Sequence, residues 1–129
     1  MTVFDDRTRA IITRSGTMRP QDVADGIFVA LAHLVASGNA PEDQAQKVAN
    51  DLRVARDAFT DNIAAEEAGL PIDIESCQHS HERLAEEIED AADYVSGCSP
   101  VGWTYGANEN DPAEAGFYPI DSDGYPIEL

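Results

Sequence analysis

Positive charge is the scarcest feature of this chain. Its 129 residues include 25 acidic side chains but only 8 lysines and arginines, and a single one of these is a lysine, so the formal net charge is −17. Affinity for nucleic acids and for anionic membranes rests mainly on clustered Lys and Arg, so both are excluded as direct ligands. Long-range attraction would instead steer the protein toward basic surfaces, including the grooves in which other proteins hold nucleic acid.

The sequence also lacks long apolar runs, and its two cysteines are far apart in the chain. No run approaches the roughly 20 residues of a membrane span, and the beginning of the chain, MTVFDDRTRA, lacks the apolar segment of a signal peptide. Cys77 and Cys98 fall near the two ends of one predicted helix, which would hold them about 30 Å apart and prevent a disulfide. Two free thiols suit a reducing compartment, and we expect a cytoplasmic protein.

The most apolar stretch, residues 20–37, predicts a central helix. Pro20 suits a first helical position, and Gly38 with Asn39 supplies a stop. At 100° per residue the larger apolar side chains fall within one arc, which contains Val23, Ile27, Phe28, Leu31, Leu34 and Val35. The other side of the helix is small and weakly polar, so a second partner could pack there.

Two longer helices should follow the central one. The second is predicted to begin at Pro41, capped by Asn39, and to end before Gly69. The third, capped by Asp73, should continue to about Ser96. Both have apolar residues at alternating steps of three and four, and in the third helix this stripe consists of Ile74, Cys77, His81, Leu84, Ile88, Ala91 and Val95. Short connections between such helices predict an all-α protein, a small up-and-down bundle of residues 20–97.

The segments on either side of the bundle are predicted to be less regular. Residues 1–19 hold half of the basic side chains beside Asp5 and Asp6, which predicts a self-neutralised lead-in containing a short helix or strand. Residues 98–129 have four of the seven prolines and no base, but also five of the nine aromatics. Because that is too many aromatics for a solvated segment, we expect an extended acidic tail packed on the bundle within a single domain, residues 1–129. In this tail, Tyr118–Asp121 and Tyr125–Glu128 would form a clasp around a turn.

Residues of metal-ligand type cluster in CQHSHE, residues 77–82. On a helix Cys77 and His81 share a face and His79 points elsewhere, whereas a closed zinc site needs four ligands. Two stretches, 108–111 and 121–124, resemble calcium loops but lack the glycine at position six and the distal glutamate, and both are interpreted as turns. We therefore predict no metal site, no cofactor and no catalytic residue.

Paired carboxylates on the third helix support an alternative. Glu86 with Glu89, and Asp90 with Asp93, are three residues apart, so each pair could hold Mg²⁺ from one helix face. In this the helix resembles the all-α nucleotide pyrophosphatases of the MazG type, whose paired-carboxylate helices bind magnesium. The resemblance covers one helix, because the Glu-x-x-Glu pair of the preceding helix and the phosphate-binding bases are missing. It implies a magnesium-dependent nucleotide hydrolase.

Our main hypothesis rests on the acidic side chains of residues 84–129. From residue 84 to the end there are eleven acids and no base, and carboxylates along a helix can present charge to a basic groove much as phosphates do. Phage-encoded inhibitors of restriction and CRISPR complexes use this device. We predict a binding protein and not an enzyme, an acidic inhibitor that mimics nucleic acid toward a basic, nucleic-acid-handling partner. Its predicted partner-binding residues are acidic side chains with apolar anchors, namely Glu82, Glu86, Glu87, Glu89, Asp90, Asp93, Trp103, Tyr105, Phe117 and Tyr118. A salt-adapted structural domain, including a homo-oligomeric one, is the other alternative.

Overall fold

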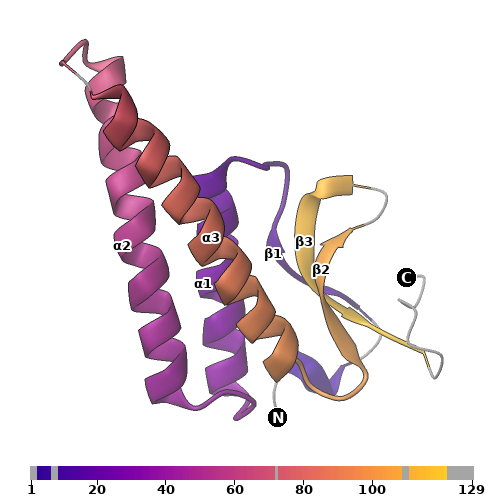
Figure 1. Ribbon diagram of the computed structural model, residues 1–129. Coiled ribbons are helices and arrows are strands. Elements are labelled where there is room, and N and C mark those ends of the chain that lie inside the picture. Colours follow the sequence, from indigo (N-terminus) through magenta and orange to yellow (C-terminus); the bar gives the residue numbers. More distant parts are fainter. Residues whose placement is uncertain (1–2, 7–8, 72, 109–110, 122–129) are drawn as a thin grey trace.

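The computed structural model describes residues 3–6, 9–71, 73–108 and 111–121, and combines three helices with a small sheet (Figure 1). The helices are α1 (Pro20–Ala36), α2 (Glu42–Glu67) and α3 (Ile74–Cys98), preceded by a short 3₁₀ helix, Val3–Asp5. The strands β1 (Ile11–Arg14), β2 (Trp103–Asn108) and β3 (Asp111–Pro119) form one antiparallel sheet in the order β1-β3-β2. The prediction of an all-α protein is therefore wrong, because the described chain is mixed α and β.

The helix boundaries lie close to those that the sequence predicted. Gly38 has a φ of 76° and ends α1 in the left-handed conformation that glycine tolerates best, while the Asp73 carboxylate accepts the backbone N–H of Glu75 as the cap of α3. The predicted cap at Asn39 is wrong. Its side-chain amide donates instead to the hydroxyl of Ser37 at 2.7 Å, within the turn that closes α1, and α2 starts at an extended Pro41 without a side-chain cap.

Helices α2 and α3 form a hairpin whose far end extends beyond α1 and the sheet (Figure 1). The predicted stripe of α3 is therefore buried only where α1 and the sheet also cover it, as at Leu84, Ala91 and Val95, whereas Ile74 at the far end is 69% exposed. His81, expected within the packed stripe, is exposed. Ser80 is buried in its place, donating to the carbonyl of Cys77 at 2.9 Å and accepting from the Asn62 amide at 2.8 Å.

The sheet joins residues of the predicted lead-in, 1–19, to residues of the predicted tail, 98–129. Residues 103–108 and 111–119, predicted as irregular, form the antiparallel pair β2 and β3, and β1 pairs with β3 so that Ile11 lies opposite Phe117. Two of the four prolines that argued against regular structure, Pro112 and Pro119, lie near the ends of β3, where a missing N–H is tolerated. The second half of the predicted clasp falls within 122–129, outside the described residues.

One hydrophobic core connects all of these elements. The sheet lies against α1 and α3, and α2 packs on the side of those helices away from the sheet (Figure 1). The core cluster contains residues from the first turn of the chain, the three helices and the sheet, including Phe4, Ile27, Leu34, Leu52, Leu84, Val95, Trp103 and Phe117. None of the described helices combines the length and the apolar character needed to cross a lipid bilayer.

Candidate functional site

The solvent face of α3 carries a continuous line of carboxylates. Glu75, Glu82, Glu86, Glu89 and Asp93 recur at intervals of seven, four, three and four residues, which places them on one side of a helix. All five are exposed, and the buried residues of α3 lie on the opposite side. We call these five residues the acidic stripe. It includes four of the six acidic side chains predicted to bind a partner.

The other two predicted carboxylates flank the stripe. Asp90 is exposed and follows Glu89 on one side, whereas Glu87 is half-buried on the turn beside Glu86. In the described part of the chain, no side chain of α3 forms an ion pair. The six predicted acidic residues therefore lie on one helix, where Arg83 is the single lysine or arginine and makes no ion pair with any of them within the described residues.

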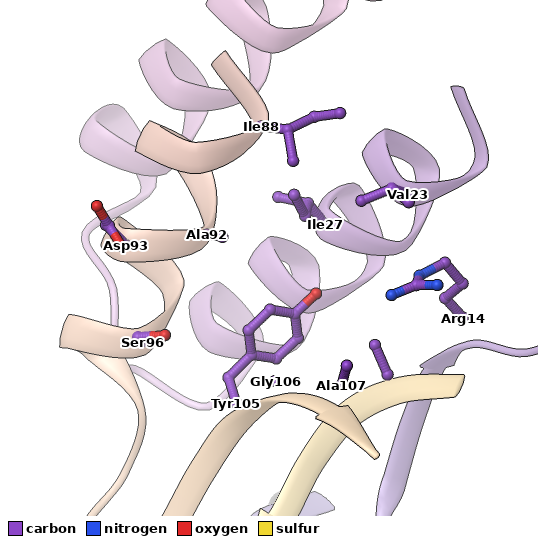
Figure 2. A pocket seen from close by; sticks show the side chains of 11 residues that line it. Arg14, Val23, Ile27, Ile88, Ala92, Asp93, Ser96, Tyr105, Gly106 and Ala107 are labelled. Carbon is purple, nitrogen blue, oxygen red and sulfur yellow. The ribbon is translucent and has the colours of Figure 1, made fainter. Parts of the chain in front are cut away.

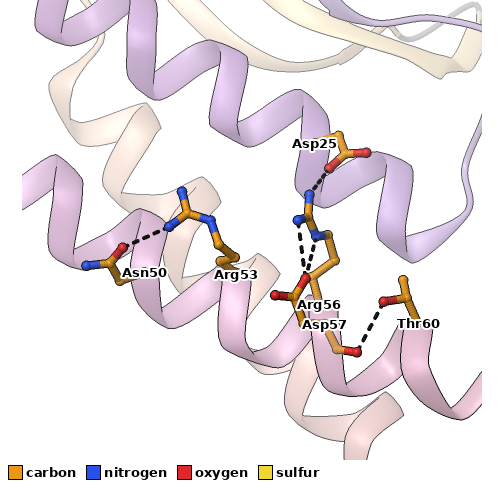
Figure 3. A network of polar contacts seen from close by, with 6 residues as sticks. All are labelled: Asp25, Asn50, Arg53, Arg56, Asp57 and Thr60. Atoms are coloured by element: carbon orange, nitrogen blue, oxygen red, sulfur yellow. Dashed lines mark hydrogen bonds and ion pairs between the residues drawn. The ribbon is translucent and has the colours of Figure 1, made fainter.

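Two of the eight basic side chains, Arg53 and Arg56, lie between α1 and α2, away from the acidic stripe (Figure 3). Arg56 of α2 forms ion pairs with Asp25 of α1 and with its neighbour Asp57, and its guanidinium also lies 5.0 Å from the ring centre of Phe28. Partial burial acts against protonation, but the hydrogen bonds to both carboxylates outweigh it and raise the pKa of Arg56. Arg53 lies 5.5 Å from the same ring. These contacts bind α1 to α2 and leave the opposite side of the helical layer acidic.

The predicted aromatic anchors separate into core and half-exposed residues. Trp103 is 5% exposed and Phe117 is fully buried. Both pack edge-on against Phe4, at ring-centre distances of 5.4 and 4.9 Å, and the indole N–H of Trp103 donates to the Phe4 carbonyl at 3.2 Å. Their burial makes them parts of the core, so neither side chain is presented to a partner. Tyr105 and Tyr118 are half-buried.

The hydroxyl of Tyr118 makes the sheet sensitive to alkaline pH. Burial, followed by the negative charge of Glu114 and a 3.3 Å hydrogen bond to its carboxylate, raises the pKa of Tyr118 from 10.0 to about 12. Because the unfolded tyrosine loses its proton first, the stability linked to this group is complete below pH 10 and falls as the pH rises from 10 to 12.

Replacing Tyr118 with phenylalanine should therefore flatten the pH dependence of stability in this alkaline window. We expect the urea midpoint of the native protein, followed by far-UV circular dichroism, to fall more steeply with pH than that of Tyr118→Phe. A smaller fall should remain in the variant, because burial also raises the pKa of Tyr105. Identical pH profiles for the two proteins would contradict the assignment.

The residues of metal-ligand type do not converge in the structure. Cys77 is half-buried on the inner side of α3, while His79 and Glu82 are exposed, and His81 lies with its ring centre 5.6 Å from that of Phe59. Among the residues that the structure describes, no group of three or more His, Cys, Asp or Glu side chains could hold a metal ion. The Glu86–Glu89 and Asp90–Asp93 pairs face outward, whereas α2 packs against the inner face of α3. The preceding helix thus supplies no carboxylate opposite these pairs.

Sequence reasoning missed a cleft between the sheet and the helices (Figure 2). The cleft is open to solvent and has a volume of about 180 Å³, and its lining comes from β1, α1, α3, β2 and β3. Arg14 and Tyr105 supply polar groups, Val23, Ile27 and Ile88 supply apolar walls, and Asp93 and Ser96 lie at the α3 side. Because these residues come from segments up to about a hundred positions apart, no local sequence pattern predicts the cleft.

Comparison of the chain with protein-family models, with curated proteins and with solved structures gave no match.

Proposed function

We propose that this protein binds a basic surface on a nucleic-acid-handling protein through the acidic stripe and its flanking carboxylates, and so competes with nucleic acid in the cytoplasm. The observation that supports this most strongly is the excess of negative charge on α3: six exposed or half-buried carboxylates beside one base, Arg83, and none of them in an ion pair in the described structure. A protein that only needed solubility would gain as much from acids scattered over all its faces.

The charge density of this helix supports mimicry of a nucleic acid strand. From Glu82 to Asp93 the helix advances by about 16 Å, at roughly 1.5 Å per residue, so its six carboxylates follow one another at mean axial intervals of about 3.3 Å. Phosphates on one strand of B-form DNA follow at about 3.4 Å. A groove that faces the acidic stripe would meet four of these charges, with Asp90 beside them, over a length that holds about five phosphates of one strand.

Electrostatic recognition of this kind sets the rate of encounter and the salt dependence more than the final affinity. The two half-buried tyrosines, Tyr105 and Tyr118, are what remains of the predicted aromatic anchors, so the proposal rests mainly on the carboxylates. A partner should accordingly bind tightly at low ionic strength and be released as salt screens the charges.

Reversing the charge at Glu86 and Asp90 should weaken binding to the partner by about tenfold or more, because like charges would then face each other across the interface. The partner is first recovered with tagged protein and eluted with salt, and its affinity is then measured with the purified pair. The matched control is Asp51→Lys with Asp61→Lys, two exposed positions of α2. It changes the net charge equally and should retain most of the affinity.

A competition assay then tests the inhibitory part of the proposal. The isolated partner should bind labelled DNA or RNA, and the native protein, but not the Glu86→Lys, Asp90→Lys variant, should displace the label. Simultaneous binding of nucleic acid and protein to the partner would contradict competition. Equal losses in the variant and its α2 control would show that net charge, and not the face of α3, governs binding.

A further inference from the structure

The cleft between the sheet and the α1–α3 pair has the features of a small-molecule site, and it shares one residue, Asp93, with the acidic stripe. Val23 and Ile27 of α1 and Ile88 and Ala92 of α3 give it apolar walls, and its volume is about 180 Å³. An apolar cavity of about 150 Å³ is sufficient to admit a benzene molecule. The cleft can therefore receive a short aliphatic or aromatic group.

Two hydrogen-bonding groups meet at one end of this cleft. Figure 2 shows the guanidinium of Arg14 and the hydroxyl of Tyr105 turned toward each other. Nη1 of Arg14 donates to the carbonyls of Thr17 at 2.6 Å and Pro112 at 3.2 Å, which fixes the guanidinium in place. Within the described residues, its Nε and Nη2 have no hydrogen-bond partner. The positive group is thus preorganised, with donors left for a ligand.

We infer that the cleft binds a small monocarboxylate with an apolar tail. The planar guanidinium of Arg14 matches the geometry of a carboxylate and can donate two parallel hydrogen bonds to it. The hydroxyl of Tyr105 supplies a further donor at the same end; burial raises the pKa of this hydroxyl despite its hydrogen bond with Thr13 and the charge of Arg14. The tail of the ligand lies against Val23, Ile27 and Ile88.

The opposite side of the cleft selects against a second negative charge. Asp93 and Ser96 line the cleft from α3, and the carboxylate of Asp93, which belongs to the acidic stripe, is turned outward at the rim of the cleft (Figure 2). A dicarboxylate of similar length would bring its second carboxylate to this acidic rim, where its charge and that of Asp93 repel. The site therefore favours a ligand that is anionic at one end only.

Four six-carbon compounds test this inference on the native protein: hexanoate, hexanamide, hexylammonium and adipate. In ¹H–¹⁵N correlation spectra, hexanoate should produce saturable shifts at cleft residues such as Ala92, Tyr105 and Gly106, and the other three should bind at least about tenfold more weakly. Absence of saturable shifts with hexanoate would overturn the inference. If hexanamide bound as tightly as hexanoate, the charge of the carboxylate would not contribute to binding. If hexylammonium bound more tightly than hexanoate, the site would bind cations through Asp93 and not anions through Arg14.

Variants then test the two donors. Arg14→Gln should weaken hexanoate binding by about tenfold or more, since a charge-assisted hydrogen bond is lost. Arg19→Gln is the matched control, because Arg19 is paired with Asp22 at 2.6 Å and does not line the cleft. The second variant is Tyr105→Phe, which keeps the aromatic ring and removes the hydroxyl. It should weaken hexanoate binding severalfold, and it tests the site even if Arg14→Gln fails to fold. Unchanged affinity in Tyr105→Phe would contradict the assigned donor. Because partner binding depends on α3 carboxylates, either proposal can fail without the other.

Discussion

Substituting alanine for Gly116 should destabilise the protein by about 3 kcal/mol or more. Gly116 lies in the middle of the central strand β3, where β1 crosses close to it. A Cβ atom at this position would lie 2.1 Å from the carbonyl oxygen of Ile11 and 2.9 Å from the Cα of Ile12. Both are backbone atoms, so no side-chain rotation can relieve the overlap, and β1 would have to separate from β3.

The matched control is Gly106→Ala, in the strand on the other side of β3. Gly106 lies directly opposite Gly116 in the β2–β3 register, but an added Cβ there would meet no atom within 4 Å. We expect its free energy of unfolding to stay within about 1 kcal/mol of the native value. Urea denaturation followed by Trp103 fluorescence and by circular dichroism measures both variants. If Gly116→Ala were as stable as Gly106→Ala, β1 could not lie against β3 as described.

Truncating Phe117 to alanine should cost about 3–5 kcal/mol, a large part of the 5–15 kcal/mol typical of a domain. Its side chain is fully buried, with ring centres 4.9 Å from Phe4 and 5.0 Å from Tyr105. The substitution leaves a cavity between the sheet, α1 and the first turn of the chain. A suitable control is Val101→Ala, because Val101 is fully exposed and should change stability by no more than about 0.5 kcal/mol.

The same experiment distinguishes a sheet that completes the core from a tail that merely rests on a helical bundle. In the structure, Phe117 and Trp103 belong to the same core cluster as Leu34 and Leu84 of the helices. The midpoints seen by Trp103 fluorescence and by helical circular dichroism should therefore move together in Phe117→Ala. A shift in the fluorescence midpoint alone would mean that the helices fold without the sheet.

The sequence by itself determined the helices and the charged surface. A helix repeats every 3.6 residues, so spacing within one segment shows which side is buried, and glycines and Asp73 marked the ends through local conformation. Because solvent-facing residues of a helix follow the same period, four of the five residues of the acidic stripe, from Glu82 to Asp93, were named from the sequence, whereas Glu87, named with them, is half-buried. Asn39 was misjudged because the hydrogen bond of its amide to Ser37 depends on how the turn folds.

Only the tertiary structure showed how the strands pair, which aromatic residues are buried in the core and where the cleft lies. A strand obtains its hydrogen bonds from another segment, and Ile11 finds Phe117 more than a hundred residues away, so no local pattern identifies the pair. Trp103 and Phe117 became core residues because that pairing folds β2 and β3 over α1 and α3. The cleft follows from the same event, since Arg14 and Tyr105 meet only when the two ends of the chain join one sheet.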